Sequence, residues 1–100
     1  MYNLLKDERR VINAFKVEEE WELSTFEDVQ LKIKILSDDS GNYYYKLSHF
    51  YVGTGKPAPK SSSLNICPTK SEALILAKNF MFYYYDEEDT GAVWYPNKEY

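Results

Sequence analysis

The fold is decided by residues 29–35, which read Val29-Gln30-Leu31-Lys32-Ile33-Lys34-Ile35. Aliphatic residues alternate here with polar ones, and this period of two is typical of a β-strand that buries one face. A similar alternation precedes it between Phe15 and Leu23, where Lys and Glu fill the even positions. Turn-forming residues occupy 37–42, and a third run of strand-forming residues extends from Tyr43 to about Val52. The sequence therefore predicts three consecutive strands.

The links between these strands are short, which favours an antiparallel meander, because parallel neighbours need a crossover of about a dozen residues. Its core face is predicted to carry the aliphatic residues of 29–35 and, from the third strand, Tyr43, Tyr45, Leu47, His49 and Tyr51. The opposite face is then predicted to show Lys32, Lys34, Tyr44, Lys46 and Phe50.

A helix is predicted after the long Gly-, Pro- and Ser-rich loop at residues 53–68. Thr69 and Glu72 have the spacing of a capping box, which marks the start of a helix. Apolar residues at helical spacing predict a helix of about residues 70–85 that covers the sheet. Its buried face is expected to hold Ala73, Leu76, Ala77, Phe80 and Tyr84, with Ile75 and Phe82 on the opposite side.

The two ends of the chain add less regular elements. Apolar residues near the amino end fit one face of a helix, which we favour over an extended arm: Leu4, Leu5, Val11, Ile12 and Phe15. Residues 92–95 are a candidate for a short edge strand. A chain of 100 residues has the size of one domain. We expect a single α+β domain over residues 1–100, in the order α-β-β-β-α, with the meander packed by the carboxyl-terminal helix.

Charge is segregated along the chain. Residues 1–28 hold four Lys or Arg against eight Asp or Glu, residues 29–81 seven against three, and residues 82–100 one against five. The three segments therefore carry charges of −4, +4 and −4, and the whole chain has a net charge of −4. Such a distribution influences which partners can approach the protein.

Residues suited to catalysis or metal binding are sparse. Cys67 and His49 are a candidate nucleophile and base, but the sequence gives no reason for them to meet. Glu18, Glu19 and Glu20 alternate sides in a strand and so cannot converge on one metal ion. The run from Asp86 to Asp89 lacks the ligand spacing of a calcium loop. We therefore expect a protein without catalytic activity, cofactor or metal.

The chain also lacks the features of an exported protein. Its first ten residues contain no sustained apolar stretch, and its single cysteine excludes an internal disulfide bond. The expected location is the cytoplasm.

The first function hypothesis is protein binding through acidic and aromatic surfaces. Rows of carboxylates can imitate nucleic-acid phosphates and occupy the basic groove of a nuclease or DNA-binding protein, and aromatic residues supply interface anchors. Small acidic chains of this composition suggest an inhibitor or antagonist, such as a phage anti-defence protein, an immunity protein or an antitoxin. The candidate partner-binding residues are Glu18, Glu20, Glu22, Trp21, Phe82, Asp86, Glu87, Glu88, Asp89 and Trp94.

The alternative hypothesis is binding of single-stranded nucleic acid on the open face of the sheet. Lysines would follow the phosphates while aromatic rings stack on bases. The candidate residues are Lys32, Lys34, Tyr44, Lys46 and Phe50, joined by Lys56 and Lys60 from the loop. The acidic ends of the chain weigh against this alternative. The sequence also leaves open a homodimer that pairs through Ile75, Phe82 and the last residues.

Overall fold

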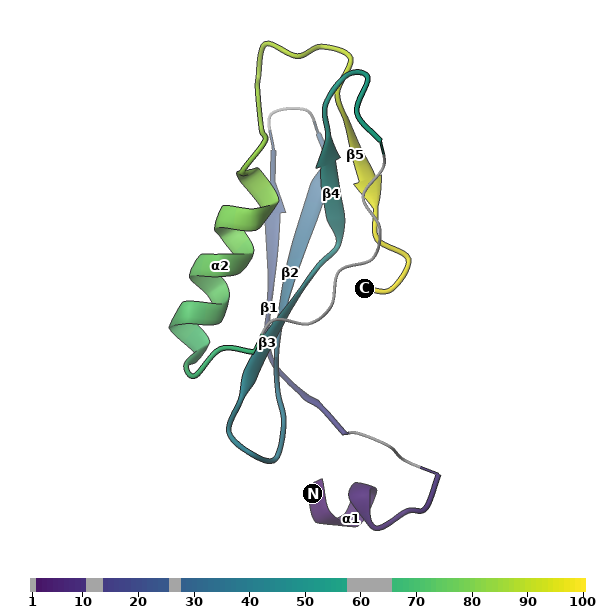
Figure 1. The fold of residues 1–100 in the computed structure, drawn as a ribbon, viewed down its shortest axis with the longest axis vertical. Coiled ribbons are helices and arrows are strands. Elements are labelled where there is room, and N and C mark those ends of the chain that lie inside the picture. Colours follow the sequence, from purple (N-terminus) through teal and green to yellow (C-terminus); the bar gives the residue numbers. More distant parts are fainter. Residues whose placement is uncertain (1, 11–13, 26–27, 58–65) are drawn as a thin grey trace.

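The computed structural model describes residues 2–10, 14–25, 28–57 and 66–100. The molecule is elongated and measures 50 × 26 × 21 Å (Figure 1). Its strands form a three-stranded sheet in the order β1-β2-β3 and a two-stranded sheet of β4 and β5. In chain order the elements are α1 (Tyr2–Lys6), β1 (Lys16–Ser24), β2 (Gln30–Ser37), β3 (Tyr43–Leu47), β4 (His49–Val52), α2 (Lys70–Phe82) and β5 (Val93–Pro96). The α+β class and the antiparallel meander are confirmed.

Strand β2 is the centre of the core. Its residues Leu31, Ile33 and Ile35 are at most 2% exposed, as their alternation predicts. The register places Ile33 opposite Leu47 of β3, and Ile35 opposite Tyr45. Burial of an aliphatic side chain stabilises a fold by about 1.5–3 kcal/mol. These three residues therefore anchor both neighbouring strands and the helix above them.

The predicted third strand is in fact two strands, because Ser48 interrupts it. The main-chain nitrogen of Ser48 donates to the carbonyl oxygen of Lys32 at 2.9 Å, and its hydroxyl accepts from the nitrogen of Lys32 at 2.6 Å. Burial moves from odd positions before Ser48 to even positions after it, so that Phe50 and Val52 are buried. The placement of Phe50 on the open lysine face is therefore wrong.

The carboxyl-terminal strand exists and has a clear partner. Strand β5 covers Val93–Pro96, close to the expected 92–95, and pairs antiparallel with β4. Tyr51 lies opposite Trp94 in this pair, and His49 lies opposite Pro96. The second sheet continues from β3 through Ser48, as Figure 1 shows.

Helix α2 begins as predicted and buries Ala73 and Ala77 as predicted, but it is rotated so that Leu76 and Phe80 lie outside the contact with the sheet. The hydroxyl oxygen of Thr69 accepts from the nitrogen of Glu72 at 3.1 Å, which confirms Thr69 as the cap. The buried residues are Ala73, Ala77 and Met81, each four positions apart. Spacing of four places them on one face, where the two small alanines let the helix approach the sheet closely.

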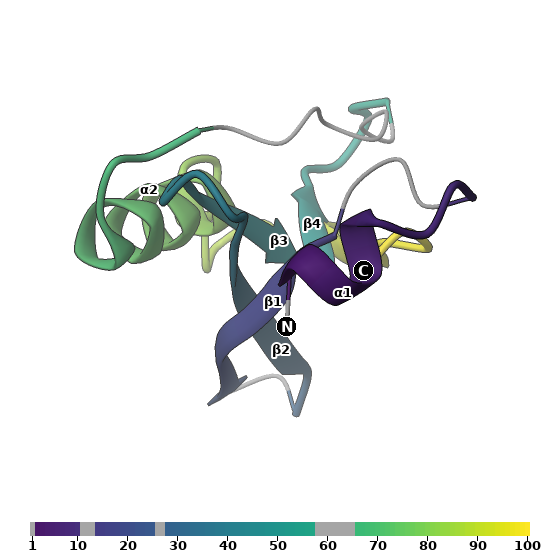
Figure 2. The same cartoon turned by 90° about the horizontal axis from the view of Figure 1, so that it is seen from below.

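The remaining apolar residues of α2 correct our expectation. Leu76 and Phe80 are 46% and 50% exposed, and Tyr84 is 75% exposed beyond the end of the helix at Phe82. Ile75 is exposed as expected, whereas Phe82 is half-buried against the core. The bulky residues thus flank the contact with the sheet, because the alanine stripe occupies it. Figure 2 shows α2 on the side of β3, with β1 and β2 extending away from it.

The amino-terminal helix is much shorter than predicted. It ends at Lys6, and Phe15 lies outside it, with its ring edge-on to Tyr44 at a centroid distance of 5.3 Å. Leu4 and Leu5 are exposed, so these two apolar side chains do not pack against the body. The predicted helical positions Val11 and Ile12 lie outside the described residues. Helix α1 therefore has only five residues, Tyr2–Lys6, and it lies apart from the sheets in Figure 1.

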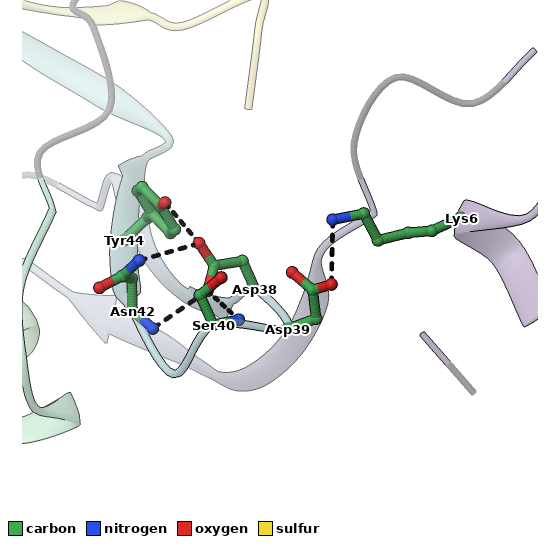
Figure 3. Close-up of polar contacts among 6 residues, drawn as sticks. All are labelled: Lys6, Asp38, Asp39, Ser40, Asn42 and Tyr44. Carbon is green, nitrogen blue, oxygen red and sulfur yellow. Dashed lines mark hydrogen bonds and ion pairs between the residues drawn. The ribbon is translucent and has the colours of Figure 1, made fainter. Parts of the chain in front are cut away.

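Asp38 organises the turn between β2 and β3 (Figure 3). Its carboxylate accepts from the hydroxyl of Tyr44 at 2.7 Å and from the main-chain nitrogens of Ser40 and Asn42 at 2.9 and 3.0 Å. These hydrogen bonds favour the ionised form and lower the pKa of Asp38 to about 2, with the Tyr44 hydroxyl the largest cause. The adjacent Asp39 pairs with Lys6 at 2.9 Å and ties α1 to this turn.

A pair of helix variants tests the orientation of α2. Met81→Ala removes a side chain that is 2% exposed and is expected to lower the free energy of unfolding by about 2–5 kcal/mol. Phe80→Ala removes a half-exposed ring and is expected to cost about 1 kcal/mol or less. Urea unfolding of both variants measures the difference. A larger loss from Phe80→Ala than from Met81→Ala would contradict the orientation.

The pH dependence of stability tests the Asp38 turn. The folded-state pKa of Asp38 is lowered, so its contribution is fully present above about pH 4 and is lost as the pH falls toward about 2. Asp38→Asn should therefore unfold more easily than the natural chain at pH 7, and the gap should narrow between pH 4 and pH 2. Thermal unfolding across this range gives the comparison. The matched variant Asp39→Asn, which removes only an exposed ion pair, should lower stability by less than about 1 kcal/mol. An unchanged gap at pH 2 would rule out the assigned role of Asp38.

Candidate functional site

An open cleft lies where the end of α2 meets the β4–β5 sheet. Its volume is about 570 Å³. The turn after α2 forms one side of the cleft, and residues of β4 and β5 form the other. Its lining comprises Val29, Tyr51, Asp86, Glu87, Asp89, Thr90, Ala92, Val93 and Trp94. The structure thus brings together four of the residues that the sequence nominated for partner binding, namely Asp86, Glu87, Asp89 and Trp94.

Four aromatic rings build the support of this cleft. Trp94 lies 5.2 Å from Tyr51 and 5.8 Å from Phe82 between ring centroids, both in edge-on contacts. Tyr85 stacks on Trp94 with an interplanar angle of 25° and lies 5.3 Å from Tyr51. Aromatic pairs at these distances add about 0.5–1.5 kcal/mol each beyond their burial. The cluster therefore holds the end of α2 against the β4–β5 sheet.

Hydrogen bonds between its main chain and the hydroxyl of Tyr51 hold Asp86 in place. Its carbonyl oxygen accepts from the hydroxyl of Tyr51 at 2.9 Å, and its nitrogen donates to the same hydroxyl oxygen at 3.2 Å. The carboxylate of Asp86 accepts from the main-chain nitrogen of Glu88 at 3.0 Å. Tyr51 therefore fixes the start of the acidic turn to strand β4.

Asp89 fixes the other end of the acidic turn. Its carboxylate accepts from the main-chain nitrogen of Thr54 at 3.0 Å, from the Thr54 hydroxyl, and from the nitrogen of Gly91 at 3.2 Å. These hydrogen bonds, those from Thr54 above all, lower the pKa of Asp89 below its ordinary value. Asp86 and Asp89 thus stabilise the conformation of the turn and also contribute to its negative charge.

Glu87 and Glu88 are the outward-facing charges of the turn. Both are exposed, and within the described parts of the chain their carboxylates form no hydrogen bond or ion pair. Negative charge at the rim and aromatic faces at the floor suit a Lys or Arg side chain, which gains both ion pairing and a cation–π contact. The chemistry of the cleft is therefore complementary to a basic side chain.

The other candidate residues, on β1, lie outside this cleft. Glu18 accepts from the hydroxyl of Ser37 at 2.7 Å, and this bond is the largest cause of its lowered pKa. Glu20 accepts from the hydroxyl of Tyr100 at 2.6 Å. Glu22 is exposed, and Trp21 is 47% exposed. The two groups of candidates are thus separate surfaces.

The predicted lysine face is partly occupied by residues 97–100. Lys34 lies 4.0 Å from the centre of the Tyr100 ring and donates to the main-chain oxygen of Tyr100 at 2.9 Å. Lys46 donates to the main-chain oxygen of Glu99 at 3.1 Å. Burial and the bond to Glu20 raise the pKa of the Tyr100 hydroxyl well above its ordinary value.

The same face also carries negative charge. The strand register sets Glu20 opposite Lys34 and Glu22 opposite Lys32, so acidic and basic rows share one surface. The hydroxyl of Tyr44 is engaged with Asp38, and Phe50 is buried. From the loop, Lys56 is exposed, and Lys60 lies outside the described residues. The nucleic-acid candidates therefore do not form a purely basic aromatic surface.

The residues considered for other chemistry are not brought together. Cys67 is 1% exposed and forms a β-bridge with Tyr43 at the start of β3, whereas His49 begins β4 and pairs with Pro96 of β5. Burial, aided by Glu72, raises the pKa of the Cys67 thiol, and burial lowers the pKa of His49. Among the described residues, no group of three or more His, Cys, Asp or Glu could hold a metal ion. In the same residues, no helix has the length and apolar content needed to cross a membrane.

Two residues that line the cleft were not predicted from the sequence to do so. Tyr51 and Val29 were assigned to the core; Val29 packs against it as predicted, but both residues also line the cleft. A change of burial phase at Ser48 would have moved Tyr51 out of the core, although no residue pattern marks that change. Of the dimer candidates, Ile75 is 56% exposed, whereas Phe82 contacts Trp94 inside the aromatic cluster.

Comparison with protein-family models, curated protein sequences and solved structures gives no match to this chain.

Removal of one hydroxyl tests how the acidic turn is held. Tyr51→Phe keeps the ring but removes both hydrogen bonds to Asp86. We expect the amide of Asp86 to exchange about tenfold faster, since one such bond is worth about 0.5–1.5 kcal/mol. Hydrogen exchange followed by NMR measures this rate. Tyr83→Phe, at a ring that is 74% exposed, is the matched control and should leave the rate unchanged. Equal rates in both variants would remove Tyr51 from this role.

Proposed function

We propose that this protein is a non-enzymatic binding module that captures a basic segment of a partner protein in the cleft between the acidic turn after α2 and the β4–β5 sheet. The observation that supports this best is the meeting of an acidic turn with an aromatic floor. Asp86, Glu87 and Asp89 line the cleft beside Tyr51 and Trp94. A guanidinium or ammonium group entering there would be attracted by the carboxylates and would stack on the rings.

The carboxylates and the aromatic rings of the cleft would contribute to partner binding in different ways. Glu87 and Glu88 are exposed, so their part is mainly to steer a basic partner toward the cleft, and salt should weaken it. Trp94 and Tyr51 are half-buried and would supply the anchoring contact area, in the way that aromatic residues dominate interface energies. The rings would therefore supply most of the contact energy, and the carboxylates would raise the association rate and, through it and ion pairing, part of the affinity.

As a biological role we propose an inhibitor or antagonist of a cytoplasmic nuclease or other nucleic-acid-binding protein. The supporting features are the small size, the net charge of −4 and a structured run of carboxylates. Such a run can occupy a basic groove in place of phosphates. Phage anti-defence proteins, immunity proteins and antitoxins act in this general manner.

Direct binding of single-stranded nucleic acid is the weaker alternative. Its residues would be Lys32, Lys34 and Lys46, two of which contact the segment 97–100. The glutamates of β1 add negative charge to that surface. A nucleic acid bound there would have to displace the segment 97–100 and overcome the repulsion from the glutamates of β1.

Charge reversal at the rim tests the proposal. The tagged natural chain, the Glu87→Lys variant and the Asp7→Lys variant are each used to capture partners from host cells after nuclease treatment. We expect one stoichiometric protein with the natural chain, unchanged capture with Asp7→Lys, and at least about tenfold less with Glu87→Lys. The two variants change the net charge equally and both positions are exposed. Only the charge at the cleft distinguishes them.

Two results would contradict the proposal. One is a captured protein that binds Glu87→Lys as tightly as the natural chain at low salt. The other is the recovery of nucleic acid before nuclease treatment with no protein left afterwards, which would favour the lysine face.

A further inference from the structure

Strand β1 forms an open edge of the three-stranded sheet. It has nine residues and pairs only with β2, in the order β1-β2-β3. The opposite edge is partly closed, because Tyr43 of β3 exchanges two main-chain hydrogen bonds of 2.8 Å with Cys67. Within the described residues, the outer edge of β1 has no such partner. An open edge presents unpaired amide and carbonyl groups that can add another strand.

Both faces of β1 are accessible beside this edge, and on one of them the carboxylate of Glu20 accepts from the Tyr100 hydroxyl at 2.6 Å. Helix α2 packs on β3, β2 and β4, and Figure 2 shows β1 extending away from it. Trp21 is therefore 47% exposed although it lies opposite the buried Ile33. Glu20 and Glu22 project on the other face. A strand added at this edge would meet Trp21 on one side, where Glu19 accepts from the indole nitrogen of Trp21 at 2.9 Å, and the carboxylates of Glu20 and Glu22 on the other.

The inner neighbour of β1 shows which side-chain pattern the strand accepts. On one face Glu20 is opposite Lys34 and Glu22 is opposite Lys32, and on the other face Trp21 is opposite Ile33. Side chains of a strand contact those of both neighbours, so the outer edge presents the same acidic and apolar rows. A strand that alternates basic and apolar residues, as β2 does, is complementary to it.

A second copy of β1 does not fit this edge. Antiparallel pairing centred on Glu20 would place Glu20 opposite its own copy and Glu18 opposite Glu22. Parallel pairing in register would align each glutamate with itself. Like charges placed directly opposite destabilise strand pairing, so the carboxylates protect the edge from self-association.

We propose that the outer edge of β1 binds an extended segment of a partner by strand addition, and that this segment alternates Lys or Arg with large apolar residues. The main-chain groups would supply the hydrogen bonds, and the two side-chain rows would select the sequence. No residue of β1 lines the cleft described above. The edge is thus a second binding surface that does not depend on the cleft.

The test uses a synthetic capped peptide that copies residues 30–37, Gln-Leu-Lys-Ile-Lys-Ile-Leu-Ser, with a second peptide in which both Lys are replaced by Glu. NMR titration of the natural chain follows the amides of β1, and hydrogen exchange follows their protection. We expect the lysine peptide to shift these amides and to slow exchange at alternate residues of 16–24. The glutamate peptide should bind at least about tenfold more weakly.

Paired variants assign the binding to the edge. Glu20→Gln with Glu22→Gln should weaken the lysine peptide about tenfold, whereas Asp7→Asn with Glu8→Gln, two exposed carboxylates outside both the edge and the cleft, should leave its affinity unchanged. Equal affinities for the two peptides, or shifts confined to Trp94 and Tyr51 in the cleft, would overturn the proposal. A concentration-dependent dimer of the natural chain that protects the β1 amides would overturn it as well, because a second copy would then occupy the edge.

Discussion

The contact of helix α2, through its buried alanine face, with strands β2 and β3 is the constraint on which the rest of the structure depends. Leu31, Ile33 and Ile35 are almost fully buried, and Ala73 and Ala77 are 0% exposed. Because alanines allow close approach, this contact sets both the distance and the rotation of the helix. It turns the larger apolar residues of α2 to the flanks and directs the end of the helix toward β4 and β5. The cleft forms at that end.

Regular patterns made part of this fold predictable. The alternation of residues 29–35 predicts the central strand, and the Thr69–Glu72 spacing predicts the start of α2, because each reflects local geometry alone. The face of α2 was predicted only in part: Ala73 and Ala77 are buried as expected, but we also assigned large apolar residues such as Phe80 to the core, and these are exposed. Hydrophobic size does not reveal that a close helix–sheet contact excludes large residues. The interruption at Ser48 depends on hydrogen bonds to Lys32, a partner far away in sequence.

The candidate site was predictable where its residues are neighbours in the chain. The run Asp86–Asp89 and Trp94 lie within nine residues of each other, and the chain reversal at the turn joins them. Tyr51 comes from another strand, so only the pairing of β4 with β5 reveals it. The mixed charge on the sheet has the same origin. Separate acidic and basic rows exist in the sequence, but the register sets Glu20 beside Lys34, and this relation requires the three-dimensional structure.

Photo-crosslinking from the cleft tests the central claim most directly. A photoreactive amino acid is placed at position 87 in one variant and at position 46, on the lysine face, in another, and each is irradiated in host cells. Capture of a basic segment in the cleft predicts that position 87 crosslinks to one protein, through a peptide rich in Lys or Arg. Crosslinks to nucleic acid from position 46, with none from position 87, would contradict it.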